Sequence, residues 1–235
     1  MRTIYQYLLS SIDAEYETVK IIKSGERGCV SLLQNKLSGT HFIFRHYRGN
    51  GEVYRKLLGV SCQNLPQIME TAEQDGMVAV LEEYIQGDSL AYLLKGALFT
   101  PAEARKIALQ LCRALWVLHS LGAVHRDIKP ENVIIRGSEA VLIDFDASRF
   151  FKSGTSQDTQ VLGTTGYAAP EQYGITQTDE RADIYSLGVL LNIMLTGKHP
   201  SKELANGKLG HIVQKCTMVN PKKRSKSVLY RMEAR

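Results

Sequence analysis

Short runs of β-branched and aromatic residues, separated by glycines, dominate the first third of the chain. They occupy residues 18–23, 29–34, 41–46 and 77–81. Runs of this length and composition, bounded by turn-forming residues, are typical of strands. One brief helical segment, residues 52–59, interrupts them. We therefore expect a small twisted antiparallel sheet with one short helix inserted into it.

The second half of the chain has the spacing of helices. Thr100, Pro101 and Glu103 form a helix-start signal, with an N-cap residue, a proline in the first turn and a glutamate that can complete a capping box. The residues that follow give one apolar face at helical spacing: Ala104, Ile107, Ala108, Leu111, Leu115 and Leu118. Residues 184–195 are apolar on nearly every side, as expected for a helix enclosed by other elements.

These two patterns predict a sheet lobe and a mainly helical lobe, joined by a hinge near residues 83–88. The chain has 235 residues, which is enough for one large core or for two small lobes. Clefts between lobes commonly bind small ligands. We therefore expect a ligand site in a cleft between the two lobes.

Composition places the chain among ordinary globular proteins, since it is 44% apolar and 23% charged. No stretch approaches the length of a membrane span, and the N-terminus lacks a continuous apolar signal core. The four cysteines are scattered and form no Cys-x-x-Cys pair, which favours isolated thiols in a reducing compartment. We expect no membrane segment in this chain and a cytoplasmic location.

The net charge of +5 raises the alternative of an anionic partner. Much of the excess lies in residues 222–226, where a solvated helix end is the simpler interpretation. No aromatic residues alternate with these charges, as stacking on nucleic-acid bases would require. We therefore do not expect a nucleic-acid partner.

The strongest chemical signal is the run His-Arg-Asp-Ile-Lys-Pro-Glu-Asn at residues 125–132, followed by Asp-Phe-Asp at residues 144–146. It places Asp127, Lys129 and Asn132 close together and supplies a second carboxylate shortly afterwards. An acid beside the attacking hydroxyl, a cation on the moving phosphoryl group and two oxygen ligands for magnesium are what phosphoryl transfer needs. The motif predicts a phosphoryl-transfer site.

With these residues the chain resembles the eukaryotic-type (Hanks-type) serine/threonine protein kinases. Three further segments follow in that family's order. Residues 81–87 resemble the hinge, residues 163–171 resemble the end of an activation segment with its closing Ala-Pro-Glu, and residues 181–188 resemble the start of the buried central helix.

The resemblance covers about residues 18–225 and implies an α+β, bilobal protein-kinase fold. It implies a single catalytic domain over residues 1–235. Within that domain we expect a small antiparallel-sheet N-lobe at about residues 13–85. A mainly helical C-lobe is expected at residues 86–235, reduced after the central helix.

The resemblance also implies roles for the catalytic residues Asp127, Lys129 and Asn132. Asp127 is the expected catalytic base, which accepts or orients the proton of the substrate hydroxyl. Lys129 is expected to neutralise charge on the transferred phosphoryl group, and its position is similar to that in serine/threonine rather than tyrosine kinases. Asn132 and Asp144 are the expected magnesium ligands. ATP and magnesium are the expected cofactors.

The nucleotide is expected to bind the first lobe and the hinge. Residues 22–30 align with the family's glycine-rich phosphate loop, where Gly25 and Gly28 permit close approach of backbone to phosphate. Arg45 stands where the family has lysine, with Glu52 as its expected partner. The ATP-binding residues that the resemblance implies are Gly25, Gly28, Val30, Arg45, Glu52, Glu83, Ile85 and Asp144.

Four positions depart from the family pattern. Lys23 replaces the first glycine of the phosphate loop, Arg45 replaces the lysine, and Asp146 replaces the glycine after Asp-Phe. Glu82 falls at the back of the adenine pocket, where the family usually has a thioether, a threonine or a bulky apolar side chain. A buried carboxylate needs a partner, so we expect Glu82 to pair with Arg45.

Other residues have structural roles by the same resemblance. Asp183 is expected to anchor the backbone of the catalytic loop from a buried position. Glu171 is expected to pair with Arg224. His125 is expected to be packed and hydrogen-bonded and not to act as a proton shuttle.

Arg126, beside the catalytic aspartate, marks the kinases that an activation-segment phosphate often controls, because arginine binds phosphate bidentately. The candidate acceptors are Ser153, Thr155, Ser156 and Thr159. Thr164 is instead expected to contact the side chains of Asp127 and Lys129. Autophosphorylation of this segment is a hypothesis that the sequence suggests.

The leading interpretation is a kinase that transfers the γ-phosphoryl group of ATP to a protein hydroxyl, so ATP and a protein substrate are the expected partners. The alternative is a pseudokinase, a nucleotide-binding or scaffolding module, favoured by the substitutions at Lys23, Arg45 and Asp146. A third interpretation is a small-molecule kinase of the aminoglycoside-phosphotransferase type, which residues 143–146 resemble. Those enzymes lack a counterpart to the Ala-Pro-Glu at residues 169–171.

Overall fold

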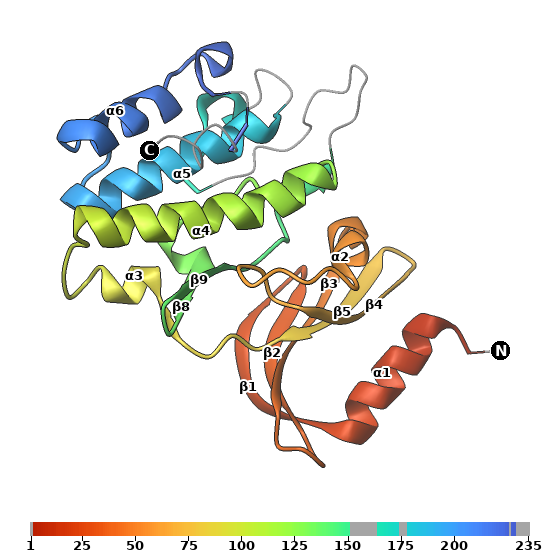
Figure 1. Ribbon diagram of the computed structural model, residues 1–235. Coiled ribbons are helices and arrows are strands. Elements are labelled where there is room, and N and C mark those ends of the chain that lie inside the picture. Colours follow the sequence, from red (N-terminus) through yellow and green to blue (C-terminus); the bar gives the residue numbers. More distant parts are fainter. Residues whose placement is uncertain (1, 151–163, 174–177, 226, 229–235) are drawn as a thin grey trace. The chain divides into compact units, whose positions relative to one another are not determined.

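A five-stranded antiparallel sheet occupies the first part of the chain (Figure 1). Its order is β1-β2-β3-β5-β4, with β1 (Tyr16–Gly25), β2 (Gly28–Asn35), β3 (His41–Arg48), β4 (Ile68–Gln74) and β5 (Met77–Glu83). The computed structural model describes residues 2–150, 164–173, 178–225 and 227–228. The four predicted strands are confirmed, and β4 is an additional strand that the hydrophobic runs do not reveal.

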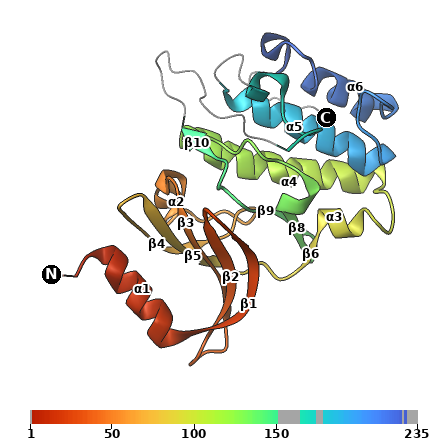
Figure 2. The same cartoon turned by 180° about the vertical axis from the view of Figure 1, so that it is seen from behind.

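Helix α1 (Ile4–Glu15) covers one face of this sheet (Figures 1 and 2). Its buried residues, Leu8 and Ile12, pack into one cluster with Phe44 of β3 and Leu81 of β5. The helix starts at Thr3 with a reciprocal capping box, which satisfies two backbone groups at its N-terminus. The sheet therefore buries one face under a helix that precedes the first strand.

Helix α2 (Glu52–Leu57) follows β3 and is shorter than the predicted segment 52–59. It ends because Leu58 adopts a ψ of 123°, outside the helical range. Asn50 Oδ1 accepts a hydrogen bond from the Glu52 backbone N–H at 2.7 Å. At Gly51 a Cβ atom would lie 2.6 Å from a carboxylate oxygen of Glu73, so a glycine is needed where this turn meets β4.

The second part of the chain is mainly helical. Its α-helices are α3 (Leu90–Leu93), α4 (Pro101–Ser120), α5 (Glu180–Thr196) and α6 (Gly207–Cys216). Among the described residues, three short 3₁₀ helices accompany them: η1 (Pro130–Asn132), η2 (Pro170–Tyr173) and η3 (Pro221–Lys223). Five short strands form two small antiparallel sheets: β6 (Asp88–Ser89), β8 (Val133–Arg136) and β9 (Glu139–Leu142), and β7 (Ala123–Val124) with β10 (Arg149–Phe150).

Helix α4 begins as its sequence predicts. The Thr100 hydroxyl accepts a hydrogen bond from the Glu103 backbone N–H, and the Glu103 carboxylate accepts one from the Thr100 backbone N–H at 2.9 Å. Pro101 is the first helical residue. This capping box confirms the predicted helix start.

Helix α5 is enclosed, as its apolar sequence predicts. It lies between α4 and α6 in both views (Figures 1 and 2). A Cβ atom at Gly188 would lie 2.5 Å from Cβ of Cys216, so α5 and α6 approach closely at this glycine. Because α5 is surrounded, residues near its N-terminus, such as Asp183, are held rigidly in the interior.

The chain divides into two units, which we call the sheet unit and the helical unit. The sheet unit comprises Met1–Cys62 and Pro66–Ile85, and the helical unit comprises Gln63–Leu65 and Gln86–Arg235. The sheet unit holds the five-stranded sheet, α1 and α2, and the helical unit holds the remaining elements. This organisation confirms the predicted α+β fold class. Among the described residues, no helix is long and apolar enough to cross a membrane.

Candidate active site

The predicted catalytic residues lie on the loop between β7 and β8 of the helical unit. Asp127 Oδ1 accepts a hydrogen bond from the Thr164 hydroxyl at 2.7 Å, and Oδ2 forms an ion pair with Lys129 Nζ at 2.7 Å. Lys129 Nζ also donates to the Thr164 hydroxyl at 2.8 Å. The predicted contact of Thr164 with both residues is confirmed. The three side chains form one polar cluster.

Two opposing effects set the pKa of Asp127. Burial raises it, but the hydrogen bonds from Lys129 and Thr164 and the positive charge of Lys129 outweigh burial and hold the pKa below its usual value. Asp127 is therefore a carboxylate at neutral pH, able only to accept hydrogen bonds. A carboxylate of low pKa is a weak base toward a free hydroxyl. It can orient that hydroxyl and take its proton once the bond to phosphorus is forming.

Asn132 is held in one orientation by Asp127. Its Nδ2 donates to the Asp127 carbonyl at 2.8 Å and to the Asp127 carboxylate at 3.0 Å. Because the amide nitrogen is committed to Asp127, Oδ1 is the side-chain atom of Asn132 that could bind a metal ion. The backbone N–H of Ile143 donates to the Asn132 carbonyl at 2.9 Å. This bond places the segment that carries Asp144 beside Asn132.

These oxygens fit the predicted magnesium ligands, because Mg²⁺ prefers amide and carboxylate oxygens. Within the described residues, no group of three or more His, Cys, Asp or Glu side chains could hold a metal ion by itself. Asn132 and Asp144 are the residues that would hold the ion, which would supply positive charge to phosphate oxygens.

Asp183 of α5 anchors the catalytic loop, as predicted. Its carboxylate accepts hydrogen bonds from the backbone N–H of His125 at 2.9 Å and of Arg126 at 2.8 Å. His119 Nε2 also lies 2.9 Å from this carboxylate. Burial raises the pKa of Asp183, but the interactions with His119 and the charge and backbone contacts of the loop outweigh it, and the pKa lies below its usual value.

His125 is packed and hydrogen-bonded, as predicted. Its Nδ1 accepts from the Asp127 backbone N–H at 3.3 Å, and its Nε2 lies 3.2 Å from the Ile143 carbonyl. The ring meets Phe145 edge to face, with centroids 5.6 Å apart. One nitrogen accepts while the other faces a carbonyl, so this arrangement fits a hydrogen on Nε2. Both ring nitrogens are occupied by backbone groups, one in the catalytic loop and one just after β9.

Two residues next to the site have left-handed backbone angles. Arg126 has a φ of 71° and Asp144 a φ of 69°. Such angles are uncommon for residues other than glycine, and they persist only where the surrounding structure enforces them. Here the hydrogen bond from Arg126 to Asp183 and the hydrogen bond from Ile143 to Asn132 restrain these backbone angles. The strain lies at the two segments that carry the predicted catalytic and magnesium-binding carboxylates.

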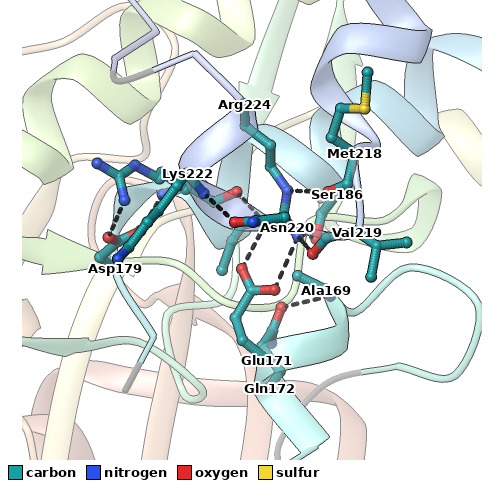
Figure 3. A network of polar contacts seen from close by, with 12 residues as sticks. Ala169, Glu171, Gln172, Asp179, Ser186, Met218, Val219, Asn220, Lys222 and Arg224 are labelled. Atoms are coloured by element: carbon teal, nitrogen blue, oxygen red, sulfur yellow. Dashed lines mark hydrogen bonds and ion pairs between the residues drawn. The ribbon is translucent and has the colours of Figure 1, made fainter. Parts of the chain in front are cut away.

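Glu171 and Arg224 form the predicted buried pair (Figure 3). Arg224 Nη2 donates to Glu171 Oε2 at 2.9 Å, and Nη1 donates to Glu171 Oε1. Arg224 also donates to the carbonyls of Met218, Arg181 and Val219. The pair joins η2, which closes the activation segment, to the chain after α6.

The predicted pair of Arg45 and Glu82 is confirmed in the sheet unit. Arg45 Nε donates to Glu82 Oε1 at 2.8 Å, and both side chains are buried. The strand register explains the pair, since Arg45 of β3 lies opposite Val80 of β5, and Glu82 is the diagonal neighbour on the same face. The two residues that depart from the family pattern are therefore in direct contact.

The expected pair of Arg45 with Glu52 stays a prediction. Arg45 forms a buried ion pair with Glu82, and Glu52 is the first residue of the short helix α2. The role of Glu52 in nucleotide binding stays a prediction.

The glycines of the predicted phosphate loop differ in their surroundings. Gly28 has a φ of 143°, and a Cβ atom there would lie 2.1 Å from the His46 carbonyl oxygen of β3. Gly28 is thus required by packing against the sheet. Gly25, its partner in the β1–β2 register, has open space where a Cβ would be. Val30 pairs with Arg45 in the β2–β3 register.

The predicted hinge residues end the sheet unit. The Glu83 backbone N–H donates to the Gln67 carbonyl at 2.8 Å, and the Glu83 carboxylate accepts from the Gln67 backbone N–H at 3.1 Å. Ile85 is buried and is the last residue of the unit. Of the predicted nucleotide-binding residues, Asp144 lies in the helical unit and the others lie in the sheet unit.

Two residues of the site, His119 and Gln172, are not predicted from the sequence. His119 contacts Asp183 from the end of α4, and Gln172 contacts the backbone of Arg126 from η2. Neither stands in a periodic pattern that would mark it. The candidate phosphorylation sites Ser153, Thr155, Ser156 and Thr159 lie outside the described residues.

The protein kinase domain family model matches residues 16–231. The chain therefore belongs to the protein kinase family, and the bilobal kinase fold that the resemblance implied is confirmed. The sheet unit and the helical unit correspond to its two lobes.

Its curated relatives include bacterial serine/threonine kinases. The chain is 30% identical over 176 residues to a probable serine/threonine-protein kinase of Clostridium perfringens, a match that covers 71% of this chain and 26% of the relative. It is 31% identical over 208 residues to the serine/threonine-protein kinase pkn2 of Myxococcus xanthus, with 80% and 25% covered. It is 40% identical over 137 residues to PknD of Mycobacterium tuberculosis, with 57% and 20% covered. The chain thus spans about a quarter of the length of these relatives.

Proposed function

We propose that this chain is an active serine/threonine protein kinase domain, which transfers the γ-phosphoryl group of ATP to a protein hydroxyl with magnesium as cofactor. The observation that carries the proposal is the cluster of Asp127, Lys129 and Thr164, with Asn132 hydrogen-bonded to the same carboxylate. It combines an ionised acceptor, a cation and an oriented amide in one loop, which is the set that phosphoryl transfer requires.

Each residue has a task in this proposal. Asp127 orients the attacking hydroxyl and receives its proton, while Lys129 stabilises charge on the transferred group. Asn132 and Asp144 would hold magnesium, which when bound neutralises charge on the phosphate oxygens. Arg45, Val30, Gly25, Gly28, Glu52, Glu83 and Ile85 are proposed to bind ATP.

The pairing of Arg45 with Glu82 bears on the pseudokinase alternative. The guanidinium Nε is held by a buried carboxylate, which reduces the charge that Arg45 offers to a phosphate. The loop chemistry is nevertheless intact at Asp127, Lys129 and Asn132, and a domain without turnover would not need those residues in contact. The proposal is therefore an active enzyme with an altered phosphate-binding cation.

We also propose a cytoplasmic, reducing location and no nucleic-acid partner. The four cysteines, all among the described residues, form no disulfide, which fits such a compartment. The physiological protein substrate is left open by this proposal.

Transfer of label from γ-labelled ATP to a generic protein acceptor in the presence of magnesium tests the proposal. Label on the acceptor supports a protein kinase, and label on the chain itself, located by mass spectrometry between residues 151 and 163, supports autophosphorylation. ATP binding without transfer would establish a pseudokinase. Label on small molecules alone would favour the aminoglycoside-type enzyme.

A further inference from the structure

Gln172 in η2 makes hydrogen bonds through both ends of its side-chain amide from a fully buried position. Its Oε1 accepts from the Ala169 backbone N–H at 3.0 Å, within the segment that closes the activation region (Figure 3). Its Nε2 donates to the Arg126 carbonyl at 2.8 Å. A buried amide that satisfies both its ends in this way fixes the relative position of the two backbones it joins.

The Arg126 carbonyl belongs to the peptide group that leads into Asp127. The N–H of that same peptide donates to His125 Nδ1 at 3.3 Å. The preceding N–H, of Arg126, is bound to Asp183. Gln172 thus donates to the Arg126 carbonyl in the turn where Arg126 has its left-handed φ of 71°. Losing that donor would remove a hydrogen bond from a buried peptide group and loosen the orientation of the peptide plane.

The segment that carries Gln172 also reaches the catalytic carboxylate directly. Thr164 contacts Asp127 at 2.7 Å, and its carbonyl accepts hydrogen bonds from the backbone N–H groups of Tyr167 and Ala168. Glu171, beside Gln172, is fixed by Arg224. One segment, residues 164–172, therefore holds the catalytic loop at two points, through a hydroxyl on the carboxylate and through an amide on the backbone.

We propose that Gln172 is a positioning residue for phosphoryl transfer. Its amide sets the orientation of the Asp127 peptide, and so makes catalysis depend on the placement of the segment that ends at Ala169-Pro170-Glu171. This inference rests on the proposed kinase function, since it specifies how that site is controlled. It predicts that Gln172 affects the transfer step more than the binding of ATP.

The substitutions Gln172→Glu and Gln172→Met test the proposal. At alkaline pH the glutamate is ionised and cannot donate to the Arg126 carbonyl, so kcat should fall about tenfold to a hundredfold with little change in the KM for ATP. A buried glutamate has a raised pKa, so lowering the pH from about 9 to about 6 should protonate it and restore kcat relative to wild type. Gln172→Met has no donor at any pH, and its kcat should stay low throughout.

Gln110→Glu is the matched control. Gln110 is also buried, with Nε2 donating to the Ser138 carbonyl and Oε1 accepting from the Ala140 N–H, away from the catalytic loop. Its kcat per folded molecule should equal that of wild type at every pH. Equal kcat in wild type and both Gln172 variants would overturn the proposal. So would a loss of kcat in the Gln172 variants that is fully explained by the fraction of unfolded protein, as expected for Gln110→Glu.

Amide hydrogen exchange separates this inference from the proposed function. In Gln172→Met the Asp127 N–H should exchange faster than in wild type, whether or not the chain transfers phosphate, because its peptide loses an anchor. If the wild type is inactive and the exchange still accelerates in Gln172→Met, only the kinase proposal is contradicted. An active wild type with unchanged exchange in Gln172→Met would contradict the positioning role alone.

Discussion

At the scale of single residues, Arg45 and Glu82 bury two opposite charges together in the sheet unit. Removing water from both charges is costly, and their attraction offsets that cost only while both are present. A variant that removes one charge should therefore be less stable than a variant that replaces both charged residues with apolar residues of similar volume.

We expect Glu82→Gln to lower the free energy of unfolding by about 3–5 kcal/mol, because it removes the buried carboxylate that pairs with Arg45. The double variant Arg45→Met, Glu82→Leu should recover most of this loss. Glu70→Gln removes an exposed carboxylate of the same unit and should change stability by no more than about 0.5 kcal/mol. Denaturant unfolding followed by circular dichroism measures all three, and equal stability of Glu82→Gln and wild type would refute the expected cost.

Asp183 should make the stability of the chain depend on pH. Its pKa is lowered in the folded state, so its contribution is fully present above the unfolded-state pKa of about 3.9 and is lost as the pH falls through the lower, folded value. Wild type should exceed Asp183→Asn in stability by at least about 2 kcal/mol at pH 7, because the ionised carboxylate accepts several hydrogen bonds. The difference should narrow on acidification below about pH 4. A difference that grows on acidification would contradict this sign.

The sequence placed the predicted catalytic residues close together correctly because their signal is local. Asp127, Lys129 and Asn132 stand in one short motif, and the pair of Arg45 and Glu82 followed from the requirement that a buried carboxylate find a cation. His119 and Gln172 were not predicted, because their partners are 64 and 46 residues away. A single amide or imidazole on a helix has no spacing that would reveal such a contact.

At the scale of elements, helix α1 is the feature with the largest energetic consequence that the sequence-based prediction omitted. Tyr5, Leu8, Leu9 and Ile12 follow the helical spacing of an apolar face, so the signal was present in the sequence. The expected lobe began at about residue 13, which leaves this helix out. The structure places these four residues against the core of the sheet unit.

Leu8→Ala should lower the stability of the chain by about 2–5 kcal/mol, because it removes a buried side chain and leaves a cavity between α1 and the sheet. Tyr7→Ala, in the same helix but on its exposed side, should cost much less. Thermal or denaturant unfolding of the two variants tests this. If both cost the same, α1 does not contribute to the core in solution.

Other elements show where periodicity is insufficient. Strand β4 was missed because Glu70, Thr71 and Glu73 interrupt its apolar residues, and only Ile68 and Ala72 are buried. Helix α2 was predicted two residues too long, because its end depends on the backbone angles at Leu58 and not on composition. By contrast α4 was predicted from its capping residues and its apolar face, and α5 from apolar residues on nearly every side.

At the scale of the whole molecule, two units divide the work that the proposed function requires. The helical unit holds Asp127, Lys129, Asn132 and Asp144, and the sheet unit holds Arg45 and the other predicted nucleotide residues. The change from strand spacing to helix spacing along the chain predicted this division. How substrates are chosen is a property of the whole protein, and the relatives from Clostridium perfringens and Myxococcus xanthus are about four times as long as the segment that matches this chain.

The central claim is that the Asp127 loop performs phosphoryl transfer, and one measurement tests it most directly. The single-turnover rate of transfer from ATP to protein is compared between wild type and Asp127→Asn, with ATP affinity determined on the same samples. We predict a rate about 10²–10⁴ times lower in Asp127→Asn, with ATP affinity unchanged. Equal rates in the two proteins, or a folded, ATP-bound wild type that transfers nothing, would contradict the claim.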